Sequence, residues 1–432
     1  MKLIGYLETL SGTTAKGWAA LGAPSGHRQV ELELLVSGSP VTTVLADVFR
    51  QDLADAHVGD GFHAFEIDLA EYLEDLETEP EITAREKSTG ATIPTLNNTA
   101  LVYRPRSQRR TYTLGEILLK PPLERNFALN AGDKLAIYAS YTVSGSLNGH
   151  HRRQIAELHE AGYKVILSHA PGRIARIRCE ADVLLLKKNI GHDFGSWWAG
   201  LTFVRERDDA FIDKMSALLL LNDSYFGAVP AAAIRAMEAL DADVAGLTDS
   251  HQVEHHLQSY CLLCKGEYLK SGGFTDMLLN YSFPASKADV IHEGEIALSR
   301  AIKKSGGSIE ALHDYDNLAT RWKMAMAAKV ETIYGYYAAL GFGPSLADEE
   351  VRTLFHLLRR LDDGFAFNPS HLFWQEIIDA GTLIVKKELL LKNPVGVPAP
   401  GERLKILGEK GVIAQDELNR ILASEKIAMH FA

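Results

Sequence analysis

The sequence predicts an α/β protein in three parts: a small β-sandwich, a mostly parallel sheet flanked by helices, and a helical C-terminal region. Three observations support this prediction. In the first hundred positions, short segments in which apolar and polar residues alternate are separated by turn residues. From residue 133, short apolar segments typical of strands take turns with segments whose apolar residues have the spacing of a helix. Beyond about residue 318, the apolar residues have helical spacing throughout. We expect the sandwich at 1–105, a linker at 106–130, the α/β domain at 131–325 and the helical region, which completes that domain, at 326–432.

The N-terminal part is predicted to be β-structure because its apolar residues alternate. Residues 30–36 (VELELLV) alternate for most of their length and are followed by a turn at 37–40 and a second run at 41–48. Another turn, at 59–61, precedes the run at 62–69 (FHAFEIDL). Short strands with such turns are typical of a sandwich, and the Pro- and Arg-rich stretch that follows indicates a linker.

From residue 133 the pattern is that of a β-α-β unit. Residues 135–141 are predicted to form a strand, and the apolar residues of 150–161 have the spacing of a helix, which Gly162 ends. The next predicted strand is at 163–168. Such units build a parallel sheet. Further β-runs occur at 182–186, 217–221, 244–247 and 260–263.

Composition and charge exclude several classes of protein. The 432 residues carry a net charge of −11, which argues against a nucleic-acid binder, because such proteins need a basic excess. Three cysteines are too few for a disulfide framework, and we expect Cys261 and Cys264, in an apolar run, to be buried strand residues. No signal peptide and no membrane helix are evident. We therefore expect a cytoplasmic protein.

Polar loops follow three of the predicted strands. Asn222, Asp223 and Ser224 come after one strand, residues 187–195 after another, and residues 248–250 after a third. Ligands of open α/β sheets bind where strands end, so these loops predict a nucleotide diphosphate pocket in which a carboxylate holds a divalent cation. The alternative is that Asn, Asp, Ser and Gly act here only as turn formers and helix caps.

Five ordered segments resemble the rhamnan synthesis protein F family, whose members are glycosyltransferases of cell-wall, capsular and lipopolysaccharide chains. They are residues 188–201 (KNIGHDFGSWWAGL), 218–227 (LLLLNDSYFG), 246–263 (GLTDSHQVEHHLQSYCLL), 290–299 (VIHEGEIALS) and 368–395 (NPSHLFWQEIIDAGTLIVKKELLLKNPV). The resemblance spans about 134–397. Residues 45–53 and 59–65 resemble a β-sandwich that is attached to bacterial glycosyltransferases.

The resemblance implies a GT-A-like domain and a nucleotide-sugar donor, typically dTDP-L-rhamnose. The family's metal- and donor-binding carboxylate matches Asp223, which has Asn222 beside it in place of a second acid. One carboxylate alone binds Mg²⁺ or Mn²⁺ weakly. Residues Asn189, Gly191 and Asp193 are expected, with Ser224, to contact the nucleotide or its sugar.

Transfer also needs a general base for the acceptor hydroxyl. By resemblance to inverting enzymes, Glu295 is the best match, with Glu293 two residues away and Asp249 as a third candidate. Both glutamates also fit the charged first turn of a helix. The acceptor is expected to be a lipid-linked or polymeric saccharide.

Four further residues are candidates for substrate contact: Ser250, His256, Gln258 and Trp197. Adjacent His255 and His256 point to opposite faces of an extended segment, so we do not expect them to share a zinc ion. For Trp197, core packing is the alternative to stacking on a sugar or base.

Residues 384–392 (IVKKELLLK) combine apolar residues with three lysines. They suggest peripheral contact with the inner face of the cytoplasmic membrane, and a solvated helix or buried strand explains them equally well. Two other functions are open. One is a sugar-phosphate transferase of capsule synthesis, using basic residues such as Arg173, Lys187 and Lys188. The other is a non-catalytic carbohydrate-binding subunit.

Overall fold

The computed structural model describes residues 2–11, 13–23, 26–73, 76, 78–103, 111–125, 127–173, 177–252, 254–283, 291–339, 349–397 and 400–413. They divide into two compact units, Met1–Thr111 with Ser282–Ala297 and Tyr112–Tyr281 with Leu298–Ala432. Parts of the segment expected to be a linker, residues 106–110 and 126, lie outside the described residues. Another part forms α3 (Leu114–Ile117) and β11 (Leu123–Glu124), which belong to the second unit.

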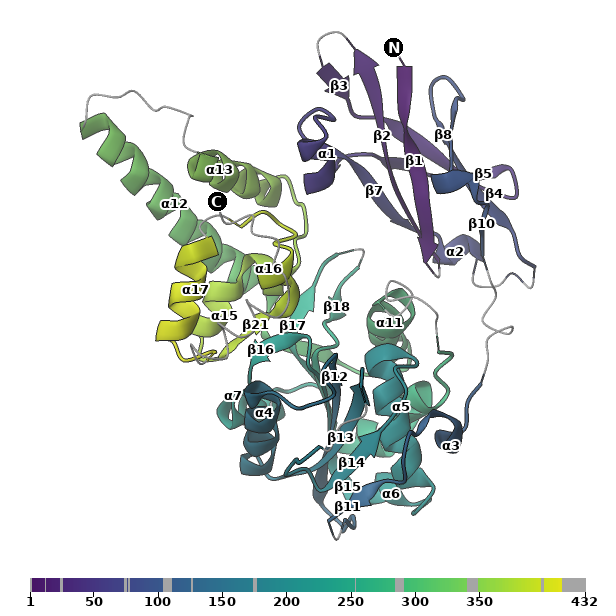
Figure 1. The fold of residues 1–432 in the computed structure, drawn as a ribbon, viewed down its shortest axis with the longest axis vertical. Coiled ribbons are helices and arrows are strands. Elements are labelled where there is room, and N and C mark those ends of the chain that lie inside the picture. The colour runs from purple at the N-terminus through teal and green to yellow at the C-terminus, as the bar shows by residue number, and fades with distance from the viewer. Residues whose placement is uncertain are drawn as a thin grey trace. The chain divides into compact units, whose positions relative to one another are not determined.

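Antiparallel strands form the N-terminal unit and are arranged in two five-stranded sheets (Figure 1). One sheet contains β1 (Lys2–Ser11), β2 (Thr14–Ala23), β3 (Gly26–Arg28), β6 (Val48–Phe49) and β7 (Phe62–Asp68). The other contains β4 (Glu31–Val36), β5 (Ser39–Leu45), β8 (Glu81–Glu86), β9 (Thr92–Ile93) and β10 (Leu101–Val102). The short helices α1 (Gln51–Asp55), α2 (Ala70–Leu73) and η1 (Leu96–Asn98) lie between strands. Side chains of both sheets, including Leu7 and Leu32, share one buried core.

The turn predicted after β4 is a two-residue hairpin loop. Val36 pairs with Ser39, and the two residues between them, Ser37 and Gly38, have positive φ angles of 49° and 81°. Positive φ at both central positions matches the right-handed twist of the flanking strands. The second strand therefore begins at Ser39, earlier than the sequence pattern predicted.

A mixed nine-stranded sheet forms the centre of the second unit. Its order is β11-β14-β13-β12-β15-β19-β17-β18, with β20 beside β17. Its longer strands are β12 (Asp133–Thr142), β13 (Tyr163–Pro171), β14 (Val183–Leu186), β15 (Met215–Asn222), β17 (Val244–Ser250), β19 (Cys261–Lys265) and β20 (Ile309–His313), and β18 (His256–Leu257) is short. The strand runs that the sequence predicted in this part of the chain all lie in this sheet.

One central strand runs against its neighbours. β12, β13, β14 and β15 are parallel to one another, as are β17 and β20, but β19 is antiparallel to both β15 and β17. The segment that joins β17 to β19 is ten residues long, 251–260, and its described residues form β18 and no helix. A parallel crossover needs a dozen or more residues. β15 and β17 consequently point the same way, and their carboxyl ends reach the same edge of the sheet.

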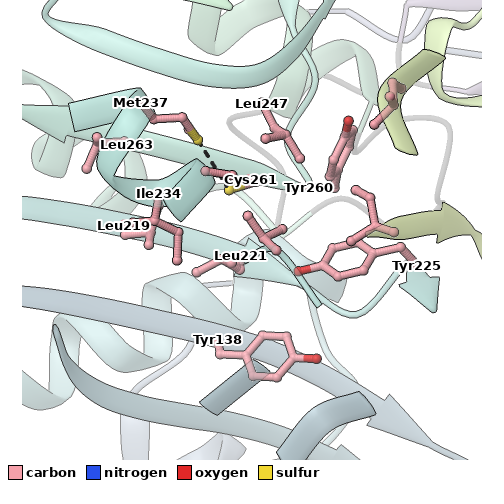
Figure 2. Close-up of a cluster of buried hydrophobic side chains, with 14 of the residues drawn as sticks. Tyr138, Leu219, Leu221, Tyr225, Ile234, Met237, Leu247, Tyr260, Cys261 and Leu263 are labelled. Carbon is pink, nitrogen blue, oxygen red and sulfur yellow. Dashed lines mark hydrogen bonds between the residues drawn. The ribbon is translucent and has the colours of Figure 1, made fainter. Parts of the chain in front are cut away.

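Alternate side chains of the sheet pack against helices on two sides. α4 (Gly149–Glu160) and α7 (Ala231–Ala239) share one core with side chains of β15 and β19. Figure 2 shows this core, in which Leu219 and Leu221 lie beside Ile234 and the Cys261 Sγ atom is 3.9 Å from the Met237 Sδ atom. Cys261 and Cys264 are fully buried, which confirms the prediction that they are strand residues.

α5 (His192–Arg205) covers the other side of the sheet (Figure 1). Residues 194–204 of this helix are all buried, as expected for a helix that is apolar all round. A Cβ atom on Gly200 would lie 2.7 Å from Ile137 Cγ2, so glycine permits the close approach of α5 to β12. The remaining helices of this part are α6 (Phe211–Lys214), α8 (Gly266–Lys270), α9 (Gly273–Leu279) and α11 (Ala297–Lys304). The helical turn η3 (Ile291–Ile296) directly precedes α11 and is grouped with the N-terminal unit.

The C-terminal region is mostly helical, as predicted, but it also contributes a strand. Its elements are α12 (Tyr315–Ala339), α13 (Glu349–Asp362), α14 (Pro369–Leu372), α15 (Trp374–Asp379), β21 (Ile384–Lys386), α16 (Lys387–Leu391) and α17 (Pro400–Glu409). The Asn368 side chain caps α14 by accepting a hydrogen bond from the Ser370 N–H group. β21 pairs with β16 (Tyr225–Gly227), just beyond the end of β15. This pairing brings the tail to the loop in which the sequence analysis placed the site.

Candidate functional site

Asp223, directly after β15, is the centre of a buried polar cluster. Its Oδ2 atom accepts hydrogen bonds from the Tyr141 N–H group at 3.0 Å and from His151 Nε2 at 3.0 Å. The Lys387 ammonium group lies 3.3 Å from the same oxygen. No contact of the other oxygen, Oδ1, is found among the described residues. Three donors therefore hold one oxygen of the carboxylate.

The fold fixes the tautomer of His151. His151 lies in the first turn of α4, and its Nδ1 atom accepts a hydrogen bond from the Asn148 N–H group at 3.1 Å, as part of the helix cap. Nε2 then carries the hydrogen and donates it to Asp223. Burial lowers the pKa of His151 to about 4, so the imidazole is neutral near pH 7.

Asp223 is ionised despite its burial. Burial by itself raises the pKa of this carboxyl group, but the Lys387 charge and the hydrogen bonds from His151 and Tyr141 outweigh it. They hold the pKa of Asp223 well below its ordinary value. The result is a fixed negative charge at the end of β15.

Two neighbours of Asp223 connect it to other elements. The Asn222 Nδ2 atom donates to Asp193 Oδ2 at 2.9 Å, and Asn222 Oδ1 accepts from the Ser224 N–H group at 3.0 Å. Asp193 lies in the first turn of α5. The loop after β14 and the loop after β15 are thus joined, as the sequence analysis expected for residues Asp193, Asn222 and Ser224.

The paired tail strand β21 adds two lysines to this cluster. The Lys386 Nζ atom donates to Ser224 Oγ at 2.7 Å and lies 4.2 Å from the centre of the Tyr260 ring. Lys387 approaches Asp223, as described above. Both lysines had suggested membrane contact from the sequence, but in the structure they face the end of β15. Lys392, the third lysine of that segment, is exposed and pairs with Glu388 on α16.

Tyr260 extends the cluster to the end of β17. Its hydroxyl oxygen is 2.7 Å from Thr248 Oγ1, which in turn donates to Gln258 Oε1 at 2.8 Å. Because Thr248 has one hydroxyl hydrogen, Tyr260 is the donor in its contact with Thr248. A continuous set of contacts therefore runs from Ser224 through Lys386 and Tyr260 to Thr248.

Asp249 follows Thr248 and makes two hydrogen bonds. Its Oδ1 atom accepts from the Tyr315 N–H group at 2.7 Å, and its Oδ2 atom accepts from His255 Nε2 at 2.8 Å. Ser250 is the β-ladder partner of His256, whose Nδ1 atom donates to the Glu254 carbonyl oxygen at 2.8 Å. The loop after β17 is thus folded back on itself by β18.

Three of the predicted site residues lie apart from these contacts. Asn189 is exposed, and Gly191 has a left-handed φ of 73° at the start of α5. Trp197 is fully buried, and its Nε1 atom donates to the Leu221 carbonyl oxygen at 2.9 Å. Core packing, the alternative given for Trp197, accounts for these contacts.

The predicted glutamates lie in a different part of the chain. Glu295 is half-buried in η3, a helical turn that is grouped with the N-terminal unit. Glu293 is in the same turn, and its side chain lies outside the described residues.

Asp193, Asp223 and Asp249 all lie at one edge of the sheet. The first two are linked through Asn222, and the loops that hold the last two are linked through Lys386 and Tyr260. A separate surface hollow, lined by residues such as Asp243, Lys265 and Ser308, lies where β17 begins, at the opposite edge. The polar cluster, and not this hollow, contains the predicted residues.

Several residues of the cluster were not found from the sequence: Tyr141, His151, Tyr260, Lys386 and Lys387. The two lysines do lie in the motif at 368–395, where their combination with apolar residues is also compatible with membrane contact. His151 has no distinctive sequence signal beyond its place near the start of a predicted helix.

No helix among the described residues is long and apolar enough to cross a membrane.

Comparison with known proteins agrees with the sequence motifs. The model of the family "Rhamnan synthesis protein F" matches residues 171–332, from the end of β13 into α12. This match confirms the resemblance that the sequence motifs indicated and supports an enzyme of glycosyltransferase type in polysaccharide synthesis. Asp193, Asp223 and Asp249 lie inside the matched segment, and Lys386 and Lys387 lie beyond it.

Two similar proteins come from Vibrio anguillarum. Virulence protein VirA of Vibrio anguillarum (strain ATCC 68554 / 775) is 28% identical over 274 residues, which are 61% of this chain and 82% of VirA. A second VirA sequence from Vibrio anguillarum matches to the same extent.

Proposed function

We propose that the chain is a glycosyltransferase that moves a sugar from a nucleotide diphosphate donor to a growing surface polysaccharide, with inversion at the anomeric carbon. L-rhamnose, carried as dTDP-L-rhamnose, is the family-typical sugar, and the α/β unit acts as a GT-A-like domain. One observation carries the proposal: β21 brings the ammonium groups of Lys386 and Lys387 to Ser224 and Asp223 at the end of β15.

The charges at this edge suit a diphosphate. The two ammonium groups, one at Ser224 and one at Asp223, would offset part of the negative charge of a leaving nucleoside diphosphate. They supply there the neutralisation that a divalent cation supplies in metal-dependent enzymes. Asp223 Oδ1 is then available to accept a hydrogen bond from a hydroxyl of the ribose or the sugar.

The reaction breaks the bond between the anomeric carbon and the diphosphate oxygen and forms a bond from that carbon to the acceptor oxygen on the opposite face. The acceptor proton passes to a carboxylate, and the nucleoside diphosphate leaves with the electron pair. Glu295 remains the proposed base because it matches the family position. Asp249 ranks behind it, because each of its oxygens already accepts a hydrogen bond.

Ligand binding tests the proposal directly. Thermal unfolding of the full chain is followed with dTDP, UDP and GDP, each with and without Mn²⁺. We expect dTDP to raise the melting temperature most, since a ligand that binds only the folded state stabilises it by mass action. Lys386→Met and Lys387→Met are each expected to weaken binding about tenfold, in proportion to about 1.4 kcal/mol of lost interaction.

Lys392→Met is the matched control, because Lys392 belongs to the same segment but pairs with Glu388 at the surface. It should leave nucleotide affinity unchanged. The proposal fails if no nucleoside diphosphate raises the melting temperature, or if the Lys392 variant loses as much affinity as the other two.

Turnover distinguishes the remaining alternatives. Release of a nucleoside diphosphate supports sugar transfer, and release of a monophosphate would identify a sugar-phosphate transferase. A non-catalytic subunit would leave polymer synthesis intact in the Asp223→Asn and Glu295→Gln variants.

For the general base, we expect Glu295→Gln to lower kcat by about 10² to 10⁴ while nucleotide affinity is retained. Glu293→Gln and Asp249→Asn are expected to lower kcat less.

A further inference from the structure

A second polar group lies on the connection that leaves β17. Asp249, His251 and His255 each offer one ligand atom, and these atoms lie within 4.8 Å of one another. The group combines one carboxylate with two imidazoles, and all three residues belong to the second unit. It is distinct from the His255–His256 pair, which the sequence analysis dismissed as a zinc site.

The three side chains are held in place before any ligand binds. The Tyr315 N–H group fixes Asp249 through Oδ1. The His251 ring stacks on the His255 ring, with centroids 5.0 Å apart, and meets the Tyr315 ring edge-on at 5.1 Å. Asp249 is buried, His255 is half-buried and His251 is exposed, so one side of the group is open to solvent.

We propose that a divalent transition-metal ion binds here, with Asp249, His251 and His255 as its protein ligands. Two imidazoles and a carboxylate suit Zn²⁺, Mn²⁺, Co²⁺ or Ni²⁺, whereas Mg²⁺ prefers a set of oxygen ligands. Three protein ligands leave coordination positions for water or for an exogenous ligand. The proposal concerns metal binding alone and does not depend on sugar transfer.

Asp223 is less suited than this group to hold a metal ion. The Lys387 ammonium group is 3.3 Å from its Oδ2 atom, and a cation at that oxygen would be repelled by this charge. At Asp249, the described contacts of the carboxylate are a backbone N–H group and an imidazole.

Lys303 competes with the ion. Its Nζ atom lies 3.2 Å from His255 Nδ1 and donates to the His255 carbonyl oxygen at 2.7 Å. Without metal, Nδ1 accepts from Lys303 while Nε2–H donates to Asp249. When Nε2 binds an ion, a neutral imidazole carries its hydrogen on Nδ1, which then faces a second donor. Lys303 must therefore leave Nδ1, and its removal should favour the metal-bound form.

Direct metal titration of the full chain tests this. Protein freed of metal with a chelator is titrated with ZnCl₂, MnCl₂ and MgCl₂ by calorimetry, and Co²⁺ binding is followed by its visible absorption. We expect one equivalent of Zn²⁺ to bind, with much weaker Mg²⁺ binding. His251→Ala and His255→Ala should each weaken Zn²⁺ binding at least about tenfold, and Lys303→Met should strengthen it.

His159→Ala is the matched control. His159 is as exposed as His255 and pairs in the same way with a carboxylate, Asp182, at 3.1 Å, but it lies outside the group. Its variant should bind Zn²⁺ like the unaltered chain. The proposal is overturned if the unaltered chain binds no Zn²⁺ or gives no Co²⁺ spectrum, if the His159 variant loses as much affinity as the other two, or if Lys303→Met weakens binding.

Discussion

Asp223 has a fixed charge because three donors from three parts of the chain converge on one of its oxygens. The Tyr141 N–H group comes from β12, His151 from α4 and Lys387 from the start of α16. A buried carboxylate without such partners would take up a proton instead. The ion pair with Lys387 is consequently both a structural and a chemical feature of the site.

A double-mutant cycle measures that ion pair. Asp223→Asn alone is expected to lower the free energy of unfolding by about 2 kcal/mol, because it leaves a partly buried ammonium group without its counter-charge. Lys387→Met alone should cost less. The double variant should lose about 1 kcal/mol less free energy of unfolding than the two single variants lose together, as expected for residues in direct contact. Urea unfolding at pH 7 gives all three values, and strict additivity would show that the two charges do not interact.

A substitution of Trp197 distinguishes core packing from a role in stacking on a sugar or base. Trp197→Phe keeps most of the buried ring but removes the hydrogen bond to the Leu221 carbonyl oxygen. We expect the free energy of unfolding to fall by about 1 to 2 kcal/mol and nucleotide affinity to stay unchanged. A selective loss of affinity at unchanged stability would instead support the sugar- or base-stacking role.

At the scale of elements, the pairing of β16 with β21 decides which residues meet at the site. Gly227, at the end of β16, has a φ of 89°, and a Cβ atom there would lie 2.0 Å from the Leu383 carbonyl oxygen. Only glycine fits this approach without distortion. The short ladder then sets the positions of Lys386 and Lys387, which directly follow the paired residues.

Gly227→Ala should therefore disturb the site without touching a functional side chain. We expect the free energy of unfolding to fall by about 2 kcal/mol or more and nucleotide affinity to fall about tenfold as the two lysines move. Gly381→Ala is the control, because Gly381 also has a positive φ, 92°, but nothing lies near its Cβ position. It should lower stability to a smaller extent and leave affinity intact. Equal losses of affinity would contradict this role of the β16–β21 ladder.

At the scale of the whole molecule, the two units have separate cores. One core joins the two N-terminal sheets, and another joins the mixed sheet with α4, α7 and α12. Separate cores predict two unfolding transitions in calorimetry. Because the polar cluster belongs to the second unit, a nucleotide should raise the melting temperature of that transition alone.

Acid should also act on the second unit. Burial lowers the pKa of His151, His169 and His313 each to about 4, from an ordinary value of 6.5. Between these values the unfolded chain binds more protons than the folded one, so stability is complete above pH 6.5 and falls as the pH decreases towards 4. Between pH 7 and pH 5, each of the three histidines is expected to lower the free energy of unfolding by roughly 2 kcal/mol.

Calorimetry at the two pH values measures this loss. The transition of the second unit should move to lower temperature at pH 5, and His151→Gln should reduce the shift. A shift of the same size in the variant would show that His151 does not contribute.

Much of the fold was predictable because it depends on local patterns. The predicted runs at 135–141, 163–168 and 217–221 are mostly buried strands. The direction of β19 was not predicted, because β19 is buried on both faces and reads as a continuous apolar run whichever way it points. Its direction follows from the short connection that precedes it.

The sequence by itself determined the α/β class, the strands of the central sheet and the acidic loops at their ends, because each depends on residues close together in the chain. Only the tertiary structure decided that Lys386 and Lys387 reach Asp223 and Ser224, more than 160 positions earlier in the chain. It also decided that His151 and Tyr141 complete the cluster and that His251 lies beside Asp249 and His255. Contacts of this kind come from the pairing of distant strands and helices, and no local pattern encodes which partners meet.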